Sequence, residues 1–223
     1  NPLVPDLLTS GHKTVGIRFP QHPLTRELLF QSQIPLAAPS ANPFGYVSPT
    51  TAQHVSQQLG DKISMILDGG PCSVGIESTI IDLSSGKPRI LRLGGLAIED
   101  IEEITGPIKV QTSSSNPKAP GMLSSHYSPG KKLLIGNIEQ LLFEFGSNNV
   151  ATLTLSKKVK GVPLSNQKIL SDKGDLTEAA SRLFSSLREL DRPDIELILV
   201  EKFPEKGLGL AINDRLKRAS TGK

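Results

Sequence analysis

The sequence is poor in several residue types that mark particular classes of protein. Its 223 residues include a single cysteine, Cys72, and no tryptophan. One cysteine cannot form a disulfide within the chain, and such chains are typical of the reducing cytoplasm, where we expect this protein to be. The stretch GGPCSVG around Cys72 contains no base that could activate a thiol. We therefore interpret Cys72 as part of a glycine-rich loop and not as a nucleophile.

Aromatic residues and grouped metal ligands are also scarce. Aromatics make up 4% of the sequence, which weighs against a platform for stacking single-stranded nucleic acid. The histidines stand at no spacing typical of a zinc site. They are His12, His22, His54 and His126. Neither a Walker lysine motif nor a GxGxxG motif is present, so the sequence predicts no protein-bound metal and neither of these standard nucleotide loops.

Long apolar runs are absent as well. No stretch approaches the roughly 18 apolar residues that a membrane span needs, and the chain does not open with a signal-peptide pattern, so we expect no membrane contact. The net charge is +3, and much of the excess lies in the final DRLKRASTGK. An excess this small does not establish nucleic-acid binding, and we interpret this end as a solvated helix.

The first half of the chain has the pattern of an α/β domain. The pattern predicts strands over residues 13–19, 34–40, 62–70, 77–84 and 88–94, and helices over 22–33, 48–60 and 97–104. In the helix predicted over 48–60, Ser48 is the expected N-cap, Pro49 the first helical residue and Gly60 the residue just past the end.

The composition changes abruptly at residues 111–130, which are rich in Ser, Pro and Gly and lack apolar periodicity. We interpret this stretch as a linker between a first domain over residues 1–110 and a second over 131–223. The second half predicts strands over 131–136, 150–156, 167–171 and 195–203, and helices over 138–145, 176–190 and 207–219. Strands that alternate with helices favour a small parallel sheet with right-handed crossovers.

The stretch APSANPFGYVSPT, residues 38–50, is rich in small polar groups but contains no Asp, Glu, His or Lys. It joins a predicted strand end to a predicted helix start, where free N–H groups suit an anion. Arg18 and Arg92 end two predicted strands, and arginine binds carboxylate or phosphate in a bidentate manner. An ordinary capped helix and two surface arginines would look the same. The residues alone therefore leave both interpretations open.

Several motifs together are more specific. TVGIRFPQHP, PLAAPSANPFGYVSPTTAQHV, ILDGGPCSVGIESTIIDL and RILRLGG resemble the YrdC-like threonylcarbamoyl-adenylate synthases in their long two-domain form, and APGMLSSHYSPG and GLGLAINDRLKRA are similar to that form's linker and second domain. The resemblance implies an α/β fold. A YrdC-like twisted mixed sheet with helices, incomplete at its N-terminus, would precede a linker and a small Rossmann-like parallel α/β domain.

The resemblance also implies a function. Members of this family form threonylcarbamoyl-AMP and pyrophosphate from L-threonine, bicarbonate and ATP, with Mg²⁺, and a partner transferase then modifies an adenosine of tRNA. Carried over by motif, the residues that contact ATP are Thr14, Ser40, Asn42, Ser48, Arg92 and Tyr127, with Tyr127 as part of a lid. Those that line the threonine pocket are Arg18, Ala38 and Ser78. No residue is assigned as catalytic.

Two alternatives without catalysis stay open: an RNA-binding module of the same fold, and a regulatory domain that binds a nucleotide. The family's Lys-x-Arg motif, which lies over the phosphates, has no counterpart in this sequence, which opens at Asn1. We therefore expect further residues upstream of Asn1 in the natural protein.

Overall fold

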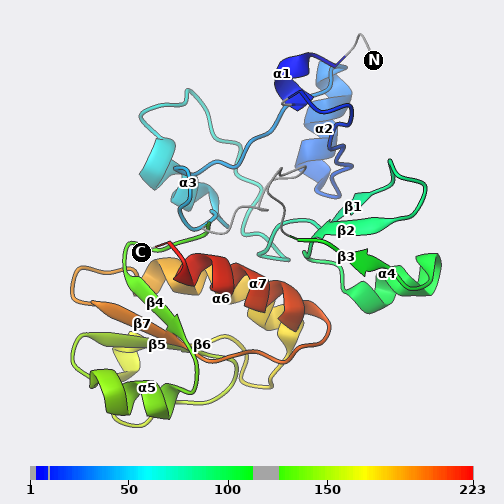
Figure 1. Cartoon of the computed structure of the whole chain (residues 1–223). Helices are drawn as coiled ribbons and strands as arrows, with labels where there is room; N and C mark the ends of the chain where they lie inside the picture. Colours follow the sequence, from blue (N-terminus) through cyan, green and yellow to red (C-terminus); the bar gives the residue numbers. More distant parts are fainter. Residues whose placement is uncertain (1–3, 10, 113–125, 223) are drawn as a thin grey trace.

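Two separate β-sheets organise the chain. The structure, a computed structural model, describes residues 4–9, 11–112 and 126–222. A three-stranded sheet has the order β1-β2-β3, and a four-stranded sheet has the order β4-β7-β5-β6. Figure 1 shows the two sheets as separate bodies, with helices α6 and α7 on one face of the four-stranded sheet and α5 on the other.

The four-stranded sheet is parallel throughout, as the sequence predicted. Its strands are β4 (Lys132–Ile135), β5 (Val150–Thr154), β6 (Gln167–Ile169) and β7 (Leu197–Val200), and its helices are α5 (Ile138–Phe145), α6 (Leu176–Leu190) and α7 (Leu208–Ser220), with a short 3-10 helix over Leu164–Asn166. Both faces of a parallel sheet are covered, and all five residues of β5 are buried.

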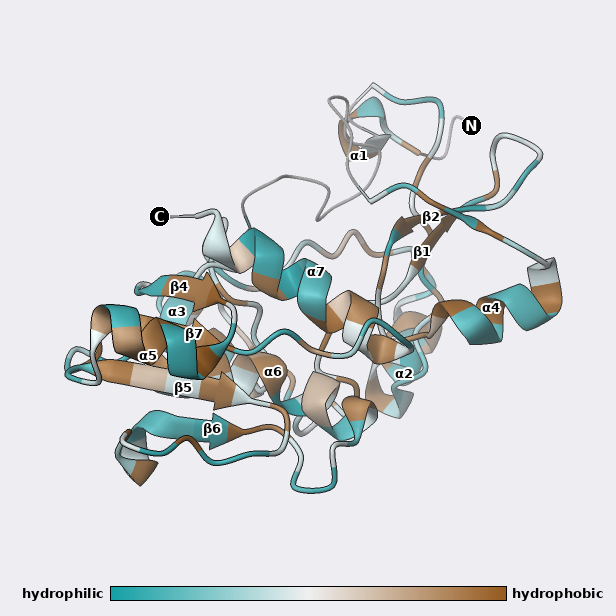
Figure 2. Ribbon diagram, turned by 60° about the horizontal axis from the view of Figure 1, so that its bottom comes forward, coloured by the Kyte–Doolittle hydropathy of each residue, from teal (hydrophilic) through white to brown (hydrophobic). Residues whose placement is uncertain are grey.

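Alternate residues of these strands serve two different cores. Leu133 of β4 and Ile198 of β7 pack with α6 and α7 in the larger core, whereas Val150 of β5 and Leu199 of β7 pack with Ile138 of α5 in the smaller one. This is the two-residue alternation of side chains along a strand. Figure 2 shows hydrophobic residues along β4, β5 and β7, while the edge strand β6 is mostly hydrophilic.

The first half contains a small mixed sheet. β1 (Ile80–Asp82) pairs antiparallel with β2 (Arg89–Arg92), which pairs in parallel with β3 (Lys109–Val110). The helices of this half are α1 (Asp6–Thr9), α2 (Pro23–Ser32), α3 (Ala52–Leu59) and α4 (Ile98–Thr105). No helix in the described part of the chain is long and apolar enough to cross a membrane.

Three strands predicted in the first half are wrong. Residues 13–19, 34–40 and 62–70 have no regular secondary structure. A strand requires a hydrogen-bonded neighbour, and within the ranges given above no strand lies beside these segments. Their apolar side chains are consequently exposed, with Ile17 91% and Met65 72% accessible. The strand predicted over 77–84 is shorter than expected, because only 80–82 pair with β2.

Two further predictions need correction. Helix α3 begins at Ala52 and its N-cap is Thr51, whose side chain accepts a hydrogen bond from the His54 N–H. Ser48 is therefore not an N-cap and Pro49 precedes the helix. The final helix is not simply solvated either. Arg215 and Arg218 of α7 are 1% and 6% exposed, because they form ion pairs with acidic residues at the junction of the two halves.

Candidate active site

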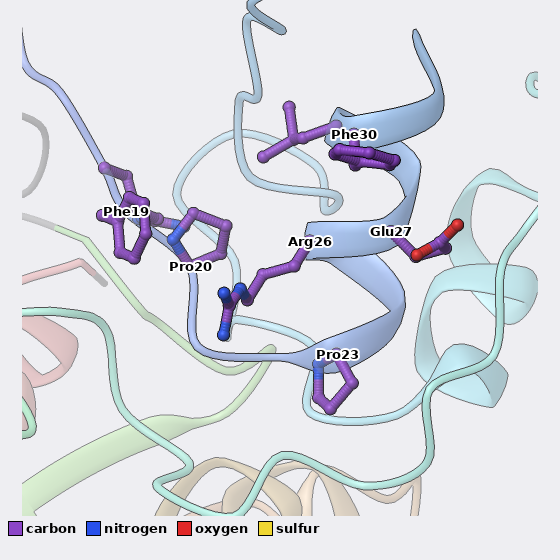
Figure 3. A pocket seen from close by; sticks show the side chains of 8 residues that line it. Phe19, Pro20, Pro23, Arg26, Glu27 and Phe30 are labelled. Carbon is purple, nitrogen blue, oxygen red and sulfur yellow. The ribbon is translucent and has the colours of Figure 1, made fainter. Parts of the chain in front are cut away.

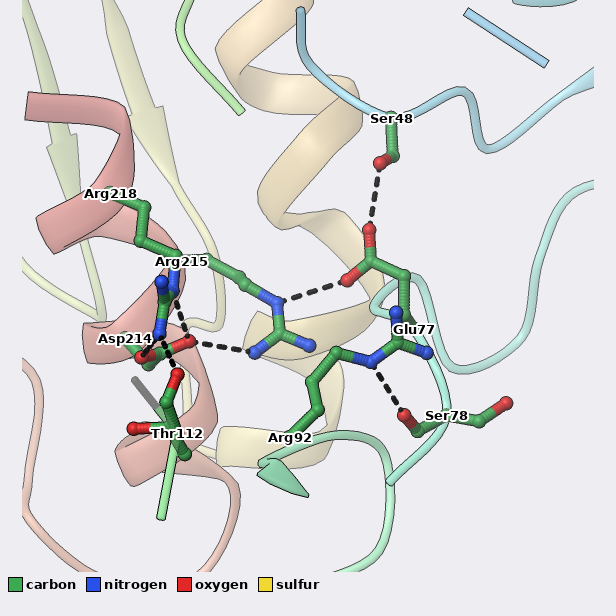
Figure 4. A network of polar contacts seen from close by, with 8 residues as sticks. All are labelled: Ser48, Glu77, Ser78, Arg92, Thr112, Asp214, Arg215 and Arg218. Atoms are coloured by element: carbon green, nitrogen blue, oxygen red, sulfur yellow. Dashed lines mark hydrogen bonds and ion pairs between the residues drawn. The ribbon is translucent and has the colours of Figure 1, made fainter. Parts of the chain in front are cut away.

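A carboxylate, Glu77, lies where the two halves of the chain meet. It ends the glycine-rich loop that leads to β1. One of its oxygens accepts a hydrogen bond from the Ser48 hydroxyl at 2.7 Å, and the other pairs with Nε of Arg215 on α7 at 2.9 Å. Figure 4 shows these two bonds reaching Glu77 from two segments that are distant from it in the sequence.

The network continues along α7. Arg215 also donates to Asp214 at 3.1 Å, and Arg218 pairs with the same carboxylate at 2.9 Å and with the Thr112 carbonyl. Burial alone would raise the pKa of Glu77, but the Arg215 guanidinium, the Ser48 hydroxyl and Arg92 together hold it below its usual range. Glu77 is thus ionised at neutral pH.

Arg92 stands beside this carboxylate at the end of β2. Its side chain is buried, and its Nε donates to the Ser78 carbonyl at 3.0 Å. Its two terminal nitrogens form no hydrogen bond with the part of the chain that the structure describes (Figure 4). Burial lowers the pKa of Arg92, and Arg215 and Arg18 act in the same direction against the opposing effect of Glu77. An anion that met the terminal nitrogens would relieve this excess of positive charge.

The loop that carries Ser48 is held by helix α6. Arg188 donates to the carbonyls of Val47 and Ser48, and its guanidinium lies 5.1 Å from the centre of the Tyr46 ring. The Tyr46 hydroxyl donates to Asp191 at 2.7 Å. Burial, together with this acceptor, raises the pKa of Tyr46 to about 12. The second half of the chain therefore fixes the position of this loop.

Asn42 stabilises the same loop from within. Its side-chain amide donates to the carbonyls of Pro43 and Tyr46 at 3.0 and 3.1 Å. Its side-chain oxygen is buried and has no hydrogen-bond partner in the described residues. Asn42 thus stabilises the loop through its amide group, and its side-chain oxygen is left to accept a further hydrogen bond.

Tyr127, predicted as part of a lid, is 2% exposed and packs in the larger core. Its ring stacks on Phe184 of α6 at 5.4 Å, and the Arg215 guanidinium lies 5.4 Å from its centre. Its backbone has a φ of 65°, which is uncommon for a residue other than glycine. Tyr127 therefore touches the Glu77 network through Arg215. Most of the predicted linker, residues 113–125, lies outside the described residues, and the lid stays a prediction.

The remaining predicted site residues lie on exposed coil. They are Thr14, Arg18, Ala38 and Ser40. Arg18 lines a groove of about 510 Å³ beside α2, together with Phe19, Pro20 and Arg26. Figure 3 shows the Arg26 side chain extending from α2 towards Phe19 and Pro20. The structure therefore brings Ser48, Ser78, Arg92 and Tyr127 together around Glu77, whereas Thr14, Ala38 and Ser40 form no part of this network.

The residues that sequence reasoning missed are those of the second half. Arg215 lies on the buried face of α7 among Ile212, Leu216 and Ala219. An arginine within the apolar stripe of a helix is rarely buried without a partner. This position was the one signal in the sequence that pointed to Arg215. Nothing local to either segment pointed to its partner Glu77, 138 residues away.

Two known protein families match the chain. Residues 1–94 match the family described as "Telomere recombination", and residues 96–221 match the family described as "Threonylcarbamoyl-AMP synthase, C-terminal domain". The chain belongs to the threonylcarbamoyl-AMP synthase family. The family predicted from the sequence motifs is thereby confirmed.

Individual members of the threonylcarbamoyl-AMP synthase family are similar over the whole chain. The threonylcarbamoyl-AMP synthase of Bacillus subtilis (strain 168) is 38% identical over 237 residues, which cover 100% of this chain and 68% of that protein. The protein of the same name from Pyrococcus abyssi is 39% identical, over 98% of this chain and 67% of that protein. This chain thus spans about two thirds of their length.

Solved structures of the family agree with the fold described above. The structure of P. abyssi Sua5 complexed with L-threonine matches with a TM-score of 0.88 at 37% identity, over 98% of this chain and 67% of that one. A variant of P. abyssi Sua5 with one histidine and one tyrosine replaced by alanine matches with a TM-score of 0.87 at 36% identity. The predicted fold class, a mixed sheet followed by a parallel α/β domain, is confirmed.

Proposed function

We propose that this chain forms threonylcarbamoyl-AMP and pyrophosphate from L-threonine, bicarbonate and ATP. The observation that carries the proposal is the position of Arg92 in a chain of this family. Arg92 is buried and bound through Nε, and its terminal nitrogens have no hydrogen-bond partner among the described residues. The reactants ATP and bicarbonate are anions, and a guanidinium with free N–H donors can bind them and neutralise their charge.

The chemistry of the reactants sets what the site has to do. The threonine amine and bicarbonate condense to a carbamate with loss of water. A carbamate oxygen then bonds to the α-phosphorus of ATP, and the bond to pyrophosphate breaks. Both partners of the second step are negatively charged, so neutralisation of charge and alignment are the main demands. A site with arginines and hydroxyls, in which the carboxylate of Glu77 is already paired with Arg215, suits these demands.

The assignment of individual residues is part of the proposal. On the nucleotide side it comprises Thr14, Ser40, Asn42, Ser48, Arg92 and Tyr127, and on the threonine side Arg18, Ala38 and Ser78. The L-threonine bound in P. abyssi Sua5 supports a threonine pocket in this chain as well. The effect of Arg18 on the pKa of Arg92 supports neighbouring pockets for the two substrates.

Mg²⁺ enters the proposal with ATP. In the described part of the chain no group of three or more His, Cys, Asp or Glu side chains could hold a metal ion. Mg²⁺ commonly binds through substrate phosphates and water and not in an all-protein cage. We therefore assign no residue of this chain as a metal ligand.

The product is a mixed anhydride of a carbamate and a phosphate, which is reactive towards nucleophiles. We propose that a transferase acting on tRNA consumes it in the cytoplasm, which also accords with the single cysteine. Direct contact between this chain and RNA belongs to the alternative of an RNA-binding module, and no feature of the site favours it.

The test is pyrophosphate release from MgATP by the 223-residue chain. We expect release that requires both threonine and bicarbonate, and much less with serine in place of threonine. Release that is independent of threonine would contradict the proposal. Absence of release together with tight, salt-dependent RNA binding would favour the RNA-binding module instead.

A further inference from the structure

The last helix of the chain reaches the proposed site through one buried arginine. The Arg215 side chain is 1% exposed and lies in the apolar stripe of α7. Burying a guanidinium is costly unless it is paired, and helix packing alone gives no reason for one at this position. Its partner Glu77 belongs to the other half of the chain and accepts a hydrogen bond from Ser48, one of the proposed ATP-binding residues.

We propose that Arg215 is a positioning residue for the ATP site: it holds Glu77 against Ser48 and away from Arg92, so that the terminal nitrogens of Arg92 are kept for the substrate. The proposal rests on the function proposed above. It assigns the second half of the chain a direct part in shaping the substrate site.

The geometry gives each oxygen of Glu77 one partner. One oxygen accepts from the Ser48 hydroxyl, and the other accepts from Nε of Arg215. Arg92 is near enough for Glu77 to affect its pKa, yet in the described structure Arg92 donates only to the Ser78 carbonyl. Without Arg215, Glu77 would have an unpaired oxygen beside two unpaired nitrogens. An ion pair between Glu77 and Arg92 would then compete with the phosphates of ATP.

Arg215 is itself held in place, which makes it an effective anchor. Its Nη1 pairs with Asp214, its guanidinium lies over the Tyr127 ring, and Asp214 is fixed in turn by Arg218. Its Nη2 is buried and has no hydrogen-bond partner in the described residues. Because one of its donors is already unsatisfied, the position of this buried guanidinium depends strongly on its remaining hydrogen bonds and ion pairs.

The test compares the wild type with Arg215→Met, Arg215→Lys, Glu77→Gln and the double variant Arg215→Met/Glu77→Gln. The affinity for MgATP is measured by calorimetry at a temperature where circular dichroism shows each protein to be folded. We expect Arg215→Met to weaken MgATP binding by at least about tenfold, which is the effect of about 1.4 kcal/mol. Arg215→Lys keeps a charge beside Glu77 but lacks the fork that also reaches Asp214, so we expect an intermediate affinity.

The double variant separates positioning from simple stabilisation. Once Glu77 is neutral it cannot capture Arg92, so we expect the double variant to regain most of the lost affinity. If Arg215 only holds the two halves together, the double variant will bind MgATP as weakly as Arg215→Met or more weakly. That result would overturn the proposal, as would unchanged affinity in Arg215→Met.

A matched control removes another contact between the halves. Glu99 of α4 accepts a hydrogen bond from the Gly207 N–H and touches none of the residues around Glu77. We expect Glu99→Ala to bind MgATP as the wild type does, and weakening equal to that of Arg215→Met would overturn the proposal. A wild-type chain that does not bind MgATP would count against the proposed function, and the positioning role would fail with it. Failure of the positioning role alone would leave wild-type binding and pyrophosphate release intact.

Discussion

Arg92 forms one hydrogen bond through Nε and leaves its other donors unused in the described structure. If these donors bind ATP, their removal lowers the affinity for MgATP. We expect Arg92→Ala to weaken MgATP binding by roughly 1.5–3 kcal/mol, the range for hydrogen bonds to charged groups. Equilibrium binding measurements with the folded variant test this.

Arg89, on the same strand, provides the control for Arg92. Its side chain pairs with Asp82 at 2.8 Å and has no contact with Glu77 or Ser78. We expect Arg89→Ala to leave MgATP affinity unchanged. Equal losses in the two variants would mean that any arginine on β2 supports the sheet, and Arg92 would then have no place in the site.

His126 offers a test that depends on pH. Burial lowers its pKa; Glu77 opposes this, while Arg218, Arg215 and Arg92 add to it. The neutral ring is thus favoured in the folded protein, and the unfolded chain takes up a proton first as the pH falls through about 6.5. His126 therefore stabilises the fold above this pH, and the stability is lost on acidification below it.

Replacement of His126 by Phe keeps an aromatic ring against Phe44 and Tyr127 and removes the titrating group. The free energy of unfolding, measured by urea denaturation between about pH 7.5 and about pH 5.5, avoids most carboxylate titration. We expect it to fall less on acidification in His126→Phe than in the wild type. A slope identical to that of the wild type would be the contrary result. His12→Phe serves as the control.

At the scale of elements, the sequence predicted best those elements whose determinants all lie within one segment of the chain. Helix α6 was predicted over 176–190 and has those bounds, because its N-cap Asp175 and its apolar stripe are contained in one segment. The segments 13–19 and 62–70 have apolar residues typical of strands, but a strand depends on a neighbour that no local pattern encodes.

Gly75 shows how closely the loop before Glu77 approaches α6. Its φ is +76°, and a Cβ atom there would lie 2.4 Å from the Ser181 carbonyl oxygen. We expect Gly75→Ala to lower the free energy of unfolding by about 2–4 kcal/mol, since it combines an unfavourable φ with a clash against helix backbone. Urea denaturation measures this loss.

Gly86 separates the two causes, because its φ is +77° and a Cβ atom there would meet nothing within 4 Å. We expect Gly86→Ala to cost about 1 kcal/mol through backbone conformation alone. Equal losses at Gly75 and Gly86 would show that the loop does not press on α6 in solution.

At the scale of the whole molecule, the site is built from contacts that join the halves of the chain. Motif resemblance identified Ser48, Ser78 and Arg92, which the structure places around Glu77. It did not identify Arg188 or Arg215, because their partners lie about 140 residues away, at separations of 141 and 138. Such contacts depend on how two folded units pack, which no periodicity along the sequence reports.

Arg188 provides the last test, since it binds the carbonyls of Val47 and Ser48 and lies against Tyr46. Arg188→Met would leave both carbonyls without this donor, and we expect a loss of about 1–3 kcal/mol in the free energy of unfolding.

The chain has two tyrosines, Tyr46 and Tyr127, and no tryptophan. Both tyrosines lie at the junction of the halves, so tyrosine fluorescence reports on that junction, whereas circular dichroism reports on all the helices. In the wild type we expect the two signals to change together in urea, because the junction is buried and charged groups are paired across it. In Arg188→Met the fluorescence should change at lower urea than the circular dichroism, since the loop separates from α6 before the parallel sheet unfolds. Coincident curves in the variant would mean that Arg188 contributes to overall stability without holding the loop that carries Ser48.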